Sequence, residues 1–500
     1  MGLKAVAIVV LAVIIAGTGV FVFSTFTPSN TTKTTSTSTT SSSCAPTLGG
    51  ASELRSTLTP TNITAITEWQ LPEPLRYANA VITAPDGSVW FGEQSVPGVA
   101  HFFPSNGTLV EYAWPNTVGE IQGSCPFKAS IWGVALWKGM VWATDQDGNS
   151  IVGLNPVNGS FQILNLPQPN SSPYTLTVGP DGALWFTALT STPFIGRVSP
   201  SFAVSMYPVL QDNNEDPTDI QFVNSSFAYF TALNPYKPVP SGLYSFDPQD
   251  VAGGVSPTPI GGNVTLSDLT SVSATSTAVY VVQHATSNLW GYGLVSHNWT
   301  IYPTSTEDYT NVTLPYFVRT SGDTVWFNEH YGNKIAELDP APVGTLTEFS
   351  EADPPVDNGS QIQNDLTIAA ASGGLWFTST TGNYIGFINA SYKPSFRISV
   401  TGSNSLTLPQ GGNAVAHLQV LGDWAKSLQV TVSDSEKFFS TPNRIAIQPN
   451  ITSLSPGSGP VSMAVDLDQT GYLPPGIYTV AVTVSDGLIL QTAYLFVTIP

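Results

Sequence analysis

The sequence has 500 residues, of which only 10% are charged, and its formal net charge is −19 because 34 Asp and Glu outnumber 15 Lys and Arg. The low charge content excludes helical bundles and coiled coils, and the 43 Gly, 40 Pro and 12 Trp favour an all-β protein with many short strands. The acidic balance argues against a nucleic-acid partner, since phosphate binding requires a basic surface.

An apolar run at residues 5–23 is the first element of the chain. As a helix it would span roughly 28 Å, enough to cross the hydrocarbon core of a membrane. Lys4 precedes the run, so the positive-inside rule places the N-terminus in the cytoplasm. Because the run is longer than the apolar part of a secretory signal, we predict an uncleaved signal anchor at 1–23, a single-pass transmembrane helix. A cleaved signal is the alternative, and both export the rest of the chain.

A segment rich in hydroxyl side chains follows, with 16 Ser or Thr among residues 24–43. Such a composition cannot bury a core, so residues 24–45 are predicted to form a stalk. Sequons of the form N-x-S/T recur along the remaining chain, which fits an exported glycoprotein on the cell surface. The candidate acceptors are Asn62, Asn106, Asn158, Asn170, Asn224, Asn263, Asn298, Asn311, Asn358, Asn389 and Asn450.

The chain has two cysteines, Cys44 and Cys125. In an oxidising exterior they can form a disulfide that ties the start of the folded part to an early loop. Two unpaired thiols are the alternative, and the sequence does not decide between them.

One unit recurs in residues 46–393, in which a strand and a tight turn are followed by an aromatic pair that opens a second strand. The clearest copies are APDGSVWFGE at 84–93, GPDGALWFTA at 179–188 and TSGDTVWFNE at 320–329. Seven aromatic residues mark the repeat at intervals of 43 to 52 residues, which is typical of four-stranded propeller blades. These marker residues are Trp90, Trp142, Trp185, Tyr229, Tyr280, Trp326 and Trp376.

An extra strand-like segment, AITEWQLP at 65–72, precedes the first unit, and the last unit lacks a fourth strand of its own. The N-terminal segment can therefore complete the last blade and remove an open sheet edge. We predict a closed seven-bladed β-propeller in which the marker aromatics form the core between blades. An open β-solenoid is the alternative architecture.

The repeat ends near Pro394, and the pattern changes to longer alternating strands such as IYTVAVTVS at 477–485. About seven strand candidates in residues 394–500 predict an immunoglobulin-like β-sandwich, which has no cysteine and therefore no disulfide between its sheets. We interpret this domain as a spacer or an adhesion module.

The phrases G-P-D-G-A-L-W-F-T at 179–187 and W-F-N-E-H-Y-G-N-K-I at 326–335 resemble the virginiamycin B lyase (streptogramin lyase) family. The resemblance covers roughly residues 63–390 and implies a seven-bladed propeller with any site at one end of its axis. It also implies elimination at the ester of a cyclic depsipeptide antibiotic, with a histidine base and with Mg²⁺ held by glutamates.

The family's histidines begin the inner strands, and none of the corresponding positions in this chain holds histidine. The Glu-Pro-His phrase of the family has its nearest counterpart in Asp216-Pro217-Thr218, which offers no base. Since an elimination needs a base within reach of the acidic C–H, the sequence argues against streptogramin lyase activity. The positions concerned are Asn79, Trp132, Tyr174, Thr218, Leu269, Tyr316 and Asp365.

Other polar residues beside the marker aromatics are the remaining candidates for a site. Glu329 and His330 can act as metal ligand and base, or as a ligand pair for a divalent ion, and a solvated loop is the alternative. His284 holds the same position in its unit as His330 and would converge with it if both face the axis. Glu93 and Asp145 follow their marker residues by three positions, as Glu329 does, so the three carboxylates can bind Mg²⁺ or Ca²⁺ if they face one another. Alternation alone does not give their direction.

From these features we predict a surface-anchored extracellular recognition protein that binds a glycan, a peptide or an envelope protein. The first alternative is a metal-dependent lyase, or an enzyme that cleaves lactones or esters, at the axial face of the propeller. The second alternative is a structural component of the cell envelope.

Overall fold

The computed structural model describes residues 53–72, 76–94, 98–114, 131–189, 193–210, 215–233, 242–261, 268–284, 286–305, 313–340, 344–351, 365–435 and 444–500. These residues contain strands and no helix, so within them no helix is able to cross a membrane. The expected anchor and stalk, both cysteines and the sequons at Asn263, Asn311 and Asn358 lie outside the described residues.

Strands β1 to β30 fall into seven antiparallel sheets. The sheets are numbered in the order in which their innermost strands occur along the chain. Sheet 1 contains β1 (Glu53–Thr57), β4 (Ala78–Thr83), β5 (Val89–Glu93), β6 (Gly98–Phe103) and β7 (Thr108–Ala113), and sheet 2 contains β8 (Val134–Trp137), β9 (Met140–Asp145), β10 (Ser150–Leu154) and β11 (Phe161–Asn165). Sheet 3 contains β12 (Pro173–Val178), β13 (Leu184–Ala188), β14 (Phe194–Val198) and β15 (Val204–Pro208), and sheet 4 contains β16 (Asp216–Asn224), β17 (Phe227–Leu233), β18 (Gly242–Phe246) and β19 (Thr258–Ile260).

The other three sheets follow the same plan. Sheet 5 contains β20 (Leu269–Ala274), β21 (Ala278–Gln283), β22 (Asn288–Gly293) and β23 (Trp299–Pro303). Sheet 6 contains β24 (Pro315–Ser321), β25 (Thr324–Glu329), β26 (Lys334–Asp339) and β27 (Thr345–Ser350). Sheet 7 contains β28 (Asp365–Ala371), β29 (Gly374–Ser379) and β30 (Tyr384–Asn389), together with β2 (Pro60–Ile63) and β3 (Ile66–Gln70) from the N-terminal side.

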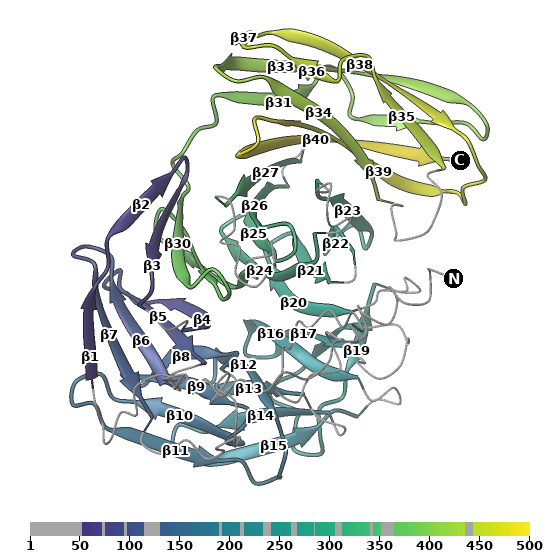
Figure 1. Cartoon of the computed structure of the whole chain (residues 1–500). Coiled ribbons are helices and arrows are strands. Elements are labelled where there is room, and N and C mark those ends of the chain that lie inside the picture. Colours follow the sequence, from purple (N-terminus) through teal and green to yellow (C-terminus); the bar gives the residue numbers. More distant parts are fainter. Residues whose placement is uncertain are drawn as a thin grey trace, which may run out of the picture.

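The innermost strand of each sheet is called its first strand here, and these seven innermost strands form a closed ring around the axis (Figure 1). Each of β4, β8, β12, β16, β20, β24 and β28 contacts the next, and β28 contacts β4. The ring is closed by the segment expected to do so, because β3 pairs with β30 in antiparallel register, with Trp69 opposite Ile385. The architecture is therefore a β-propeller, and the open solenoid is wrong.

Pairs of a large and a small residue explain how the sheets pack so closely. The second strand of most sheets carries an aromatic residue whose partner in the third strand is Gly or Ala, as in Phe186 opposite Gly196 and Phe377 opposite Gly386. A Cβ on Gly196 would lie 2.0 Å from the Phe186 ring, so only glycine fits beneath that ring. The marker aromatics fill the space between sheets, and Trp185 of sheet 3 packs in one cluster with Phe230 of sheet 4.

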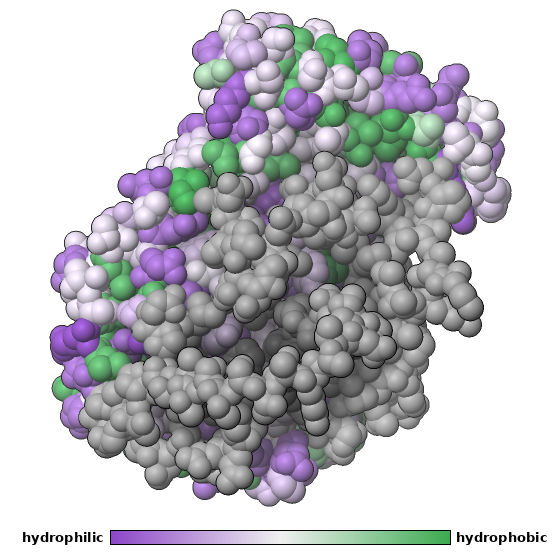
Figure 2. Space-filling model, viewed as in Figure 1, coloured by the Kyte–Doolittle hydropathy of each residue, from purple (hydrophilic) through white to green (hydrophobic). Residues whose placement is uncertain are grey.

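The C-terminal strands form two sheets that share one hydrophobic core, and one of these sheets is continuous with sheet 6. One contains β31 (Phe396–Val400), β33 (Asn413–Trp424), β35 (Ile445–Pro449), β37 (Gly457–Ser458) and β38 (Val461–Gln469). The other contains β32 (Ser405–Thr407), β34 (Leu428–Asp434), β36 (Ser453–Leu454), β39 (Gly476–Ser485) and β40 (Ile489–Ile499). This C-terminal layer projects from one side of the ring, and polar and apolar residues mix on the face that Figure 2 shows.

The C-terminal layer is joined to the propeller through a continuous sheet. Strand β40 pairs with β27 of sheet 6, from Thr345 opposite Ala493 to Phe349 opposite Ile489. Tyr494 is fully buried in a cluster with residues of sheets 5 and 6, and its hydroxyl donates to the carbonyl of Pro303 at 3.0 Å. A freely moving spacer is not consistent with this shared core.

Candidate functional site

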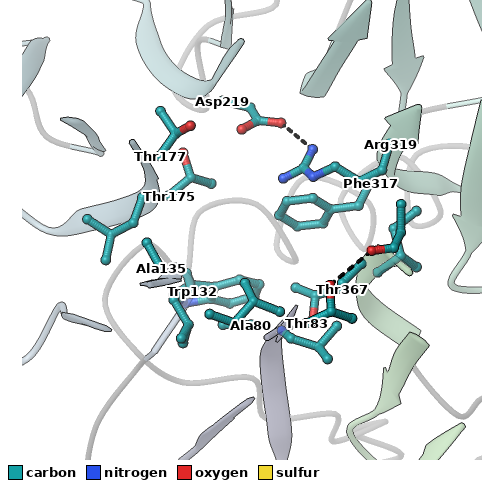
Figure 3. A pocket seen from close by; sticks show the side chains of 18 of the residues that line it. Ala80, Thr83, Trp132, Ala135, Thr175, Thr177, Asp219, Phe317, Arg319 and Thr367 are labelled. Atoms are coloured by element: carbon teal, nitrogen blue, oxygen red, sulfur yellow. Dashed lines mark hydrogen bonds and ion pairs between the residues drawn. The ribbon is translucent and has the colours of Figure 1, made fainter. Parts of the chain in front are cut away.

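A cavity of about 380 Å³ lies on the axis of the ring and is lined by the first strands of six of the seven sheets. Its wall is mostly apolar or hydroxyl-bearing, with Trp132 and Phe317 as aromatic members (Figure 3). Asp219 and Arg319 are its charged residues. A cavity of this size with a few converging polar groups has the character of a small-molecule binding site.

Asp219 and Arg319 reach the cavity from β16 and β24 and form an ion pair, with Nη1 of Arg319 2.8 Å from Oδ2 of Asp219. Ser271 of β20, between them, donates to Asp219 at 2.6 Å and accepts from Arg319 at 2.9 Å. The backbone N–H groups of Ile220 and Val272 also donate to Asp219, at 3.0 and 3.2 Å. The carboxylate is thus fully engaged and holds the guanidinium in place.

The guanidinium of Arg319 keeps donors for another molecule. Its hydrogen bonds in the described part of the chain all use Nη1, including one to the carbonyl of Val318 at 2.7 Å, so Nε and both Nη2 hydrogens are free. The side chain is 30% exposed, and its guanidinium carbon lies 5.0 Å from the centre of the Phe317 ring. Arginine held in one orientation can bind a carboxylate through two parallel hydrogen bonds.

An aromatic cluster closes the axis at the start of the first strands. The hydroxyls of Tyr174 and Tyr316 lie 2.5 Å apart, and the Trp132 ring is 5.2 Å from that of Tyr174 and 6.1 Å from that of Tyr316. Burial is the main cause that raises the pKa of both tyrosines, so neither supplies a base at neutral pH. These three residues occupy positions to which the resemblance assigns histidine.

Other positions of that set tie neighbouring first strands together. The side-chain amide of Asn79 donates to the carbonyl of Ile131 at 3.1 Å, and the hydroxyl of Thr218 is 3.0 Å from the carbonyl of Leu269. Polar side chains at these positions therefore stabilise the ring through hydrogen bonds that reach from one sheet toward the next.

His284 and His330 converge, as their equivalent positions in neighbouring units suggested. Their ring centres are 4.9 Å apart, and both residues are 4% exposed. The Nδ1 of His284 donates to Oδ2 of Asp268 at 3.0 Å. Burial lowers the pKa of His330 well below its usual value, and the neighbouring His284 acts in the same direction, so the His330 ring is neutral at physiological pH.

Glu329, adjacent in sequence to His330, belongs to a different cluster. Its carboxylate lies 3.5 Å from Nζ of Lys334, which is 3.1 Å from Glu348 and donates to Oγ of Ser305 at 2.6 Å. Glu329, Lys334 and Glu348 have fully buried side chains, and burial raises the pKa of Glu329 well above its usual range. Glu329 is the last residue of β25 and His330 lies in the turn that follows, so the two side chains enter different surroundings.

Glu93 and Asp145 also have local partners. Glu93 lies 4.0 Å from Nε of the buried Arg76, which forms a closer ion pair with Glu111 at 2.5 Å. Asp145 accepts a hydrogen bond from the N–H of Gly148 at 2.8 Å, and burial raises its pKa to about 6. The expected metal site of Glu329, Glu93 and Asp145 is therefore not assembled, and no group of three or more His, Cys, Asp or Glu in the described ranges is placed to hold an ion.

The sequons that fall within the described residues all lie on the surface. Their asparagines are exposed, in agreement with what an attached glycan requires. They are Asn62, Asn106, Asn158, Asn170, Asn224, Asn298, Asn389 and Asn450.

The ion pair in the cavity is the feature of the candidate site that the sequence did not reveal. Asp219 and Arg319 are separated by 100 residues, and each lies in a strand whose pattern only predicts burial. The available signal was a charged side chain within an innermost strand: Asp219 lies three residues after Asp216, and Arg319 lies three residues after Tyr316.

Comparison with known proteins supports the scaffold. Residues 65–234 match the model of the Virginiamycin B lyase family, and no curated protein matches the chain. Selenomethionine-substituted virginiamycin B lyase from Staphylococcus aureus has a similar structure, with 18% identity and a TM-score of 0.52 over 65% of this chain and 98% of that one.

Two further solved structures are similar at the same level. A streptogramin B lyase has 19% identity and a TM-score of 0.51 over 66% of this chain and 99% of that one. A catalytically inactive virginiamycin B lyase from Staphylococcus aureus, solved with quinupristin, has 18% identity and a TM-score of 0.50 over 65% of this chain and 98% of that one. At such identities the likeness establishes a shared propeller fold.

Proposed function

We propose that this chain is a surface-anchored extracellular recognition protein whose propeller binds a carboxylate-bearing ligand in its axial cavity. The observation that carries the proposal is the guanidinium of Arg319, held by Asp219 and Ser271 with its remaining donors free at the cavity wall. The free C-terminus of a peptide and the carboxylate of an acidic sugar share the chemistry that such a group recognises.

The surroundings of Arg319 favour specific binding over a purely structural ion pair. Asp219 fixes the guanidinium through Nη1, which leaves Nε and Nη2 for a bidentate contact. The rings of Phe317 and Trp132 offer apolar surface to the rest of the ligand. Thr177 and Thr83 add hydroxyl groups on other strands of the same wall. Orienting polar groups within an apolar wall are typical of ligand sites.

Streptogramin lyase activity is a poorer explanation of the same scaffold. An elimination requires a base, and Trp132, Tyr174 and Tyr316 stand where the resemblance would place histidines. Glu329 and His330 lie in separate clusters and do not make the base and metal-ligand pair that an ester-cleaving enzyme would need. A binding role requires the propeller scaffold but neither a catalytic base nor a metal ligand.

The proposed location follows from the sequence outside the described residues. The apolar run at 5–23 would hold the chain in the membrane, and the Ser/Thr-rich segment would carry a seven-bladed propeller and an immunoglobulin-like sandwich away from it. The exposed sequon asparagines fit a glycosylated exterior.

The proposal is tested by ligand binding to the full chain in detergent micelles. Peptides with a free or an amidated C-terminus, and glucuronic acid against glucose, distinguish the two sources of the carboxylate. We expect a carboxylate form of one class to bind and its neutral counterpart to bind at least tenfold more weakly. Arg319→Met should remove this preference, whereas Arg397→Met, which changes an exposed arginine of the C-terminal layer, should keep it.

Three results would overturn the proposal. If the charged and neutral forms bind equally to Arg397→Met as well as to Arg319→Met, then Arg319 does not recognise the carboxylate. Turnover of an ester or lactone that persists in Arg319→Met would favour an enzyme, and the absence of any ligand would favour a structural component of the envelope.

A further inference from the structure

Two buried histidines at one end of the axis carry an inference that is independent of the cavity. His284 follows β21 of sheet 5 and His330 follows β25 of sheet 6, so the repeat places them at equivalent points of adjacent sheets. Their rings are 4.9 Å apart, and each residue is 4% exposed. We propose that His284 and His330 together bind one divalent transition-metal ion such as Zn²⁺.

Each ring has a buried nitrogen without a partner. Nε2 of His284 and Nδ1 of His330 are inaccessible to solvent and make no hydrogen bond to the described residues. Leaving a buried polar atom unsatisfied costs free energy, and native proteins avoid it by placing a water, an ion or a ligand there. Two such nitrogens on adjacent rings point to a shared occupant.

Asp268 prepares His284 for this role. Its carboxylate accepts the Nδ1–H of His284 at 3.0 Å, so the proton of a neutral ring is on Nδ1 and Nε2 carries the lone pair. Metal-binding histidines commonly donate their second nitrogen to a carboxylate, which orients the ring and raises its basicity.

The separation of the rings fits a single ion. A metal–nitrogen distance of about 2.0–2.1 Å places the ion about 3.2 Å from each ring centre. Rings whose centres are 4.9 Å apart then subtend about 100° at the ion, between the ideal octahedral and tetrahedral angles. Imidazole suits Zn²⁺, Cu²⁺, Ni²⁺ and Co²⁺ and does not suit Mg²⁺, so the proposed site differs in its metal from a carboxylate site.

The surroundings set the expected strength of binding. No third His, Cys, Asp or Glu of the described residues joins the pair, so the ion would have two protein ligands. The aromatic neighbours Tyr316 and Tyr331 limit access of water, with ring centres 5.4 and 4.8 Å from that of His330. We expect one ion per chain and an affinity below that of a structural four-ligand site.

The test is calorimetric titration of the untagged full chain with Zn²⁺ and, separately, with Mg²⁺ at neutral pH. We expect one equivalent of Zn²⁺ to bind and Mg²⁺ not to compete. His284→Ala and His330→Ala should each weaken Zn²⁺ binding at least tenfold, and Asp268→Asn should weaken it by about 10- to 100-fold through the lost orientation of His284. His297→Ala and His417→Ala, which change exposed histidines, are the matched controls and should bind as the parent chain does.

A spectroscopic measurement on the parent chain avoids dependence on variants that fail to fold. Bound Cu²⁺ should show electron paramagnetic resonance splitting from two imidazole nitrogens. Splitting from fewer nitrogens, or Zn²⁺ binding that is unchanged in folded His284→Ala and His330→Ala chains, overturns the proposal. So does the absence of Zn²⁺ uptake by the parent chain.

Discussion

The hydroxyls of Tyr174 and Tyr316 lie 2.5 Å apart across the axis of the propeller and hydrogen-bond to each other. Both residues begin the first strands of their sheets, at positions where the resemblance to streptogramin lyases places histidines. The end of the axis that would hold a base instead holds a hydrogen-bonded pair packed beside Trp132. Because tyrosines stand where the resemblance places histidines, similarity of fold does not imply that this chain shares the activity of the enzymes it resembles.

Tyr316→Phe should destabilise the propeller because it leaves the buried hydroxyl of Tyr174 without its partner. The expected loss is about 1–3 kcal/mol of unfolding free energy, measured by urea denaturation. Tyr472→Phe, which changes a tyrosine that is 72% exposed, should have little effect.

The double variant tests whether the hydrogen bond itself is responsible. Tyr174→Phe/Tyr316→Phe removes both hydroxyls and leaves no unsatisfied group, so its loss should be smaller than the sum of the two single losses. Additive losses would contradict the direct bond and would indicate that each tyrosine acts through separate packing.

Tyr494→Ala should lower the stability of the propeller although the residue belongs to the C-terminal layer. Its ring lies in the core with residues of sheets 5 and 6, and truncation of a buried aromatic costs about 3–5 kcal/mol. Tryptophan fluorescence reports the effect on the propeller, since 11 of the 12 tryptophans precede residue 394.

Deletion of residues 394–500 is the more severe form of the same change. It removes β40 from the edge of β27 and exposes the unpaired edge of sheet 6. We expect a lower melting temperature and aggregation of the shortened chain. Two independent transitions in calorimetry of the full chain, the first unaffected by Tyr494→Ala, would show that the two parts unfold separately.

The repeat and its closure could be predicted from the sequence because they depend on local patterns. Turn residues and the marker aromatics locate the first two strands of each sheet, and a displaced fourth strand at 65–72 implies the pairing seen between β3 and β30. The direction of side chains at strand ends could not be predicted in this way. Glu329 and His330 are adjacent and look like one pair, yet Glu329 ends β25 and His330 lies in the turn after it, and their side chains enter separate clusters.

Contacts between distant segments were the other limit. Asp219 and Arg319 meet only because the ring brings β16, β20 and β24 side by side, and nothing local to either residue indicates its partner. The pairing of β27 with β40 is similar, since both strands read as ordinary members of separate domains. Pairing between distant segments is determined by tertiary packing, and the local pattern of a single sequence contains little information about it.

Gly196→Ala should destabilise sheet 3 because the added methyl group would collide with the Phe186 ring. The Cβ would lie 2.0 Å from that ring, and overpacking of this kind costs about 1–3 kcal/mol. Gly253→Ala is the matched control, since a Cβ there has no atom within 4 Å. Thermal melting of both variants checks the prediction, and equal melting temperatures would contradict the tight aromatic–glycine pairing.

Glu93→Gln should change how stability depends on pH. Burial, aided by the nearby Glu111, raises the pKa of Glu93 well above its usual value, while Arg76 acts in the opposite direction. The folded chain therefore holds this proton more tightly than the unfolded chain. The resulting stabilisation is complete below the unfolded pKa of about 4.5 and is lost as the pH rises through the folded pKa. The amide of glutamine mimics the protonated acid at every pH.

We therefore expect Glu93→Gln and the parent chain to melt at similar temperatures in acid and the variant to become relatively more stable toward alkaline pH. The gain should exceed the roughly 0.5 kcal/mol of ordinary surface substitutions, because the parent must bury a charge there. Calorimetry across the pH range measures the difference, and Asp423→Asn, which changes an exposed carboxylate, should run parallel to the parent. A constant difference between Glu93→Gln and the parent at all pH values would mean that Arg76 keeps Glu93 ionised in the folded chain.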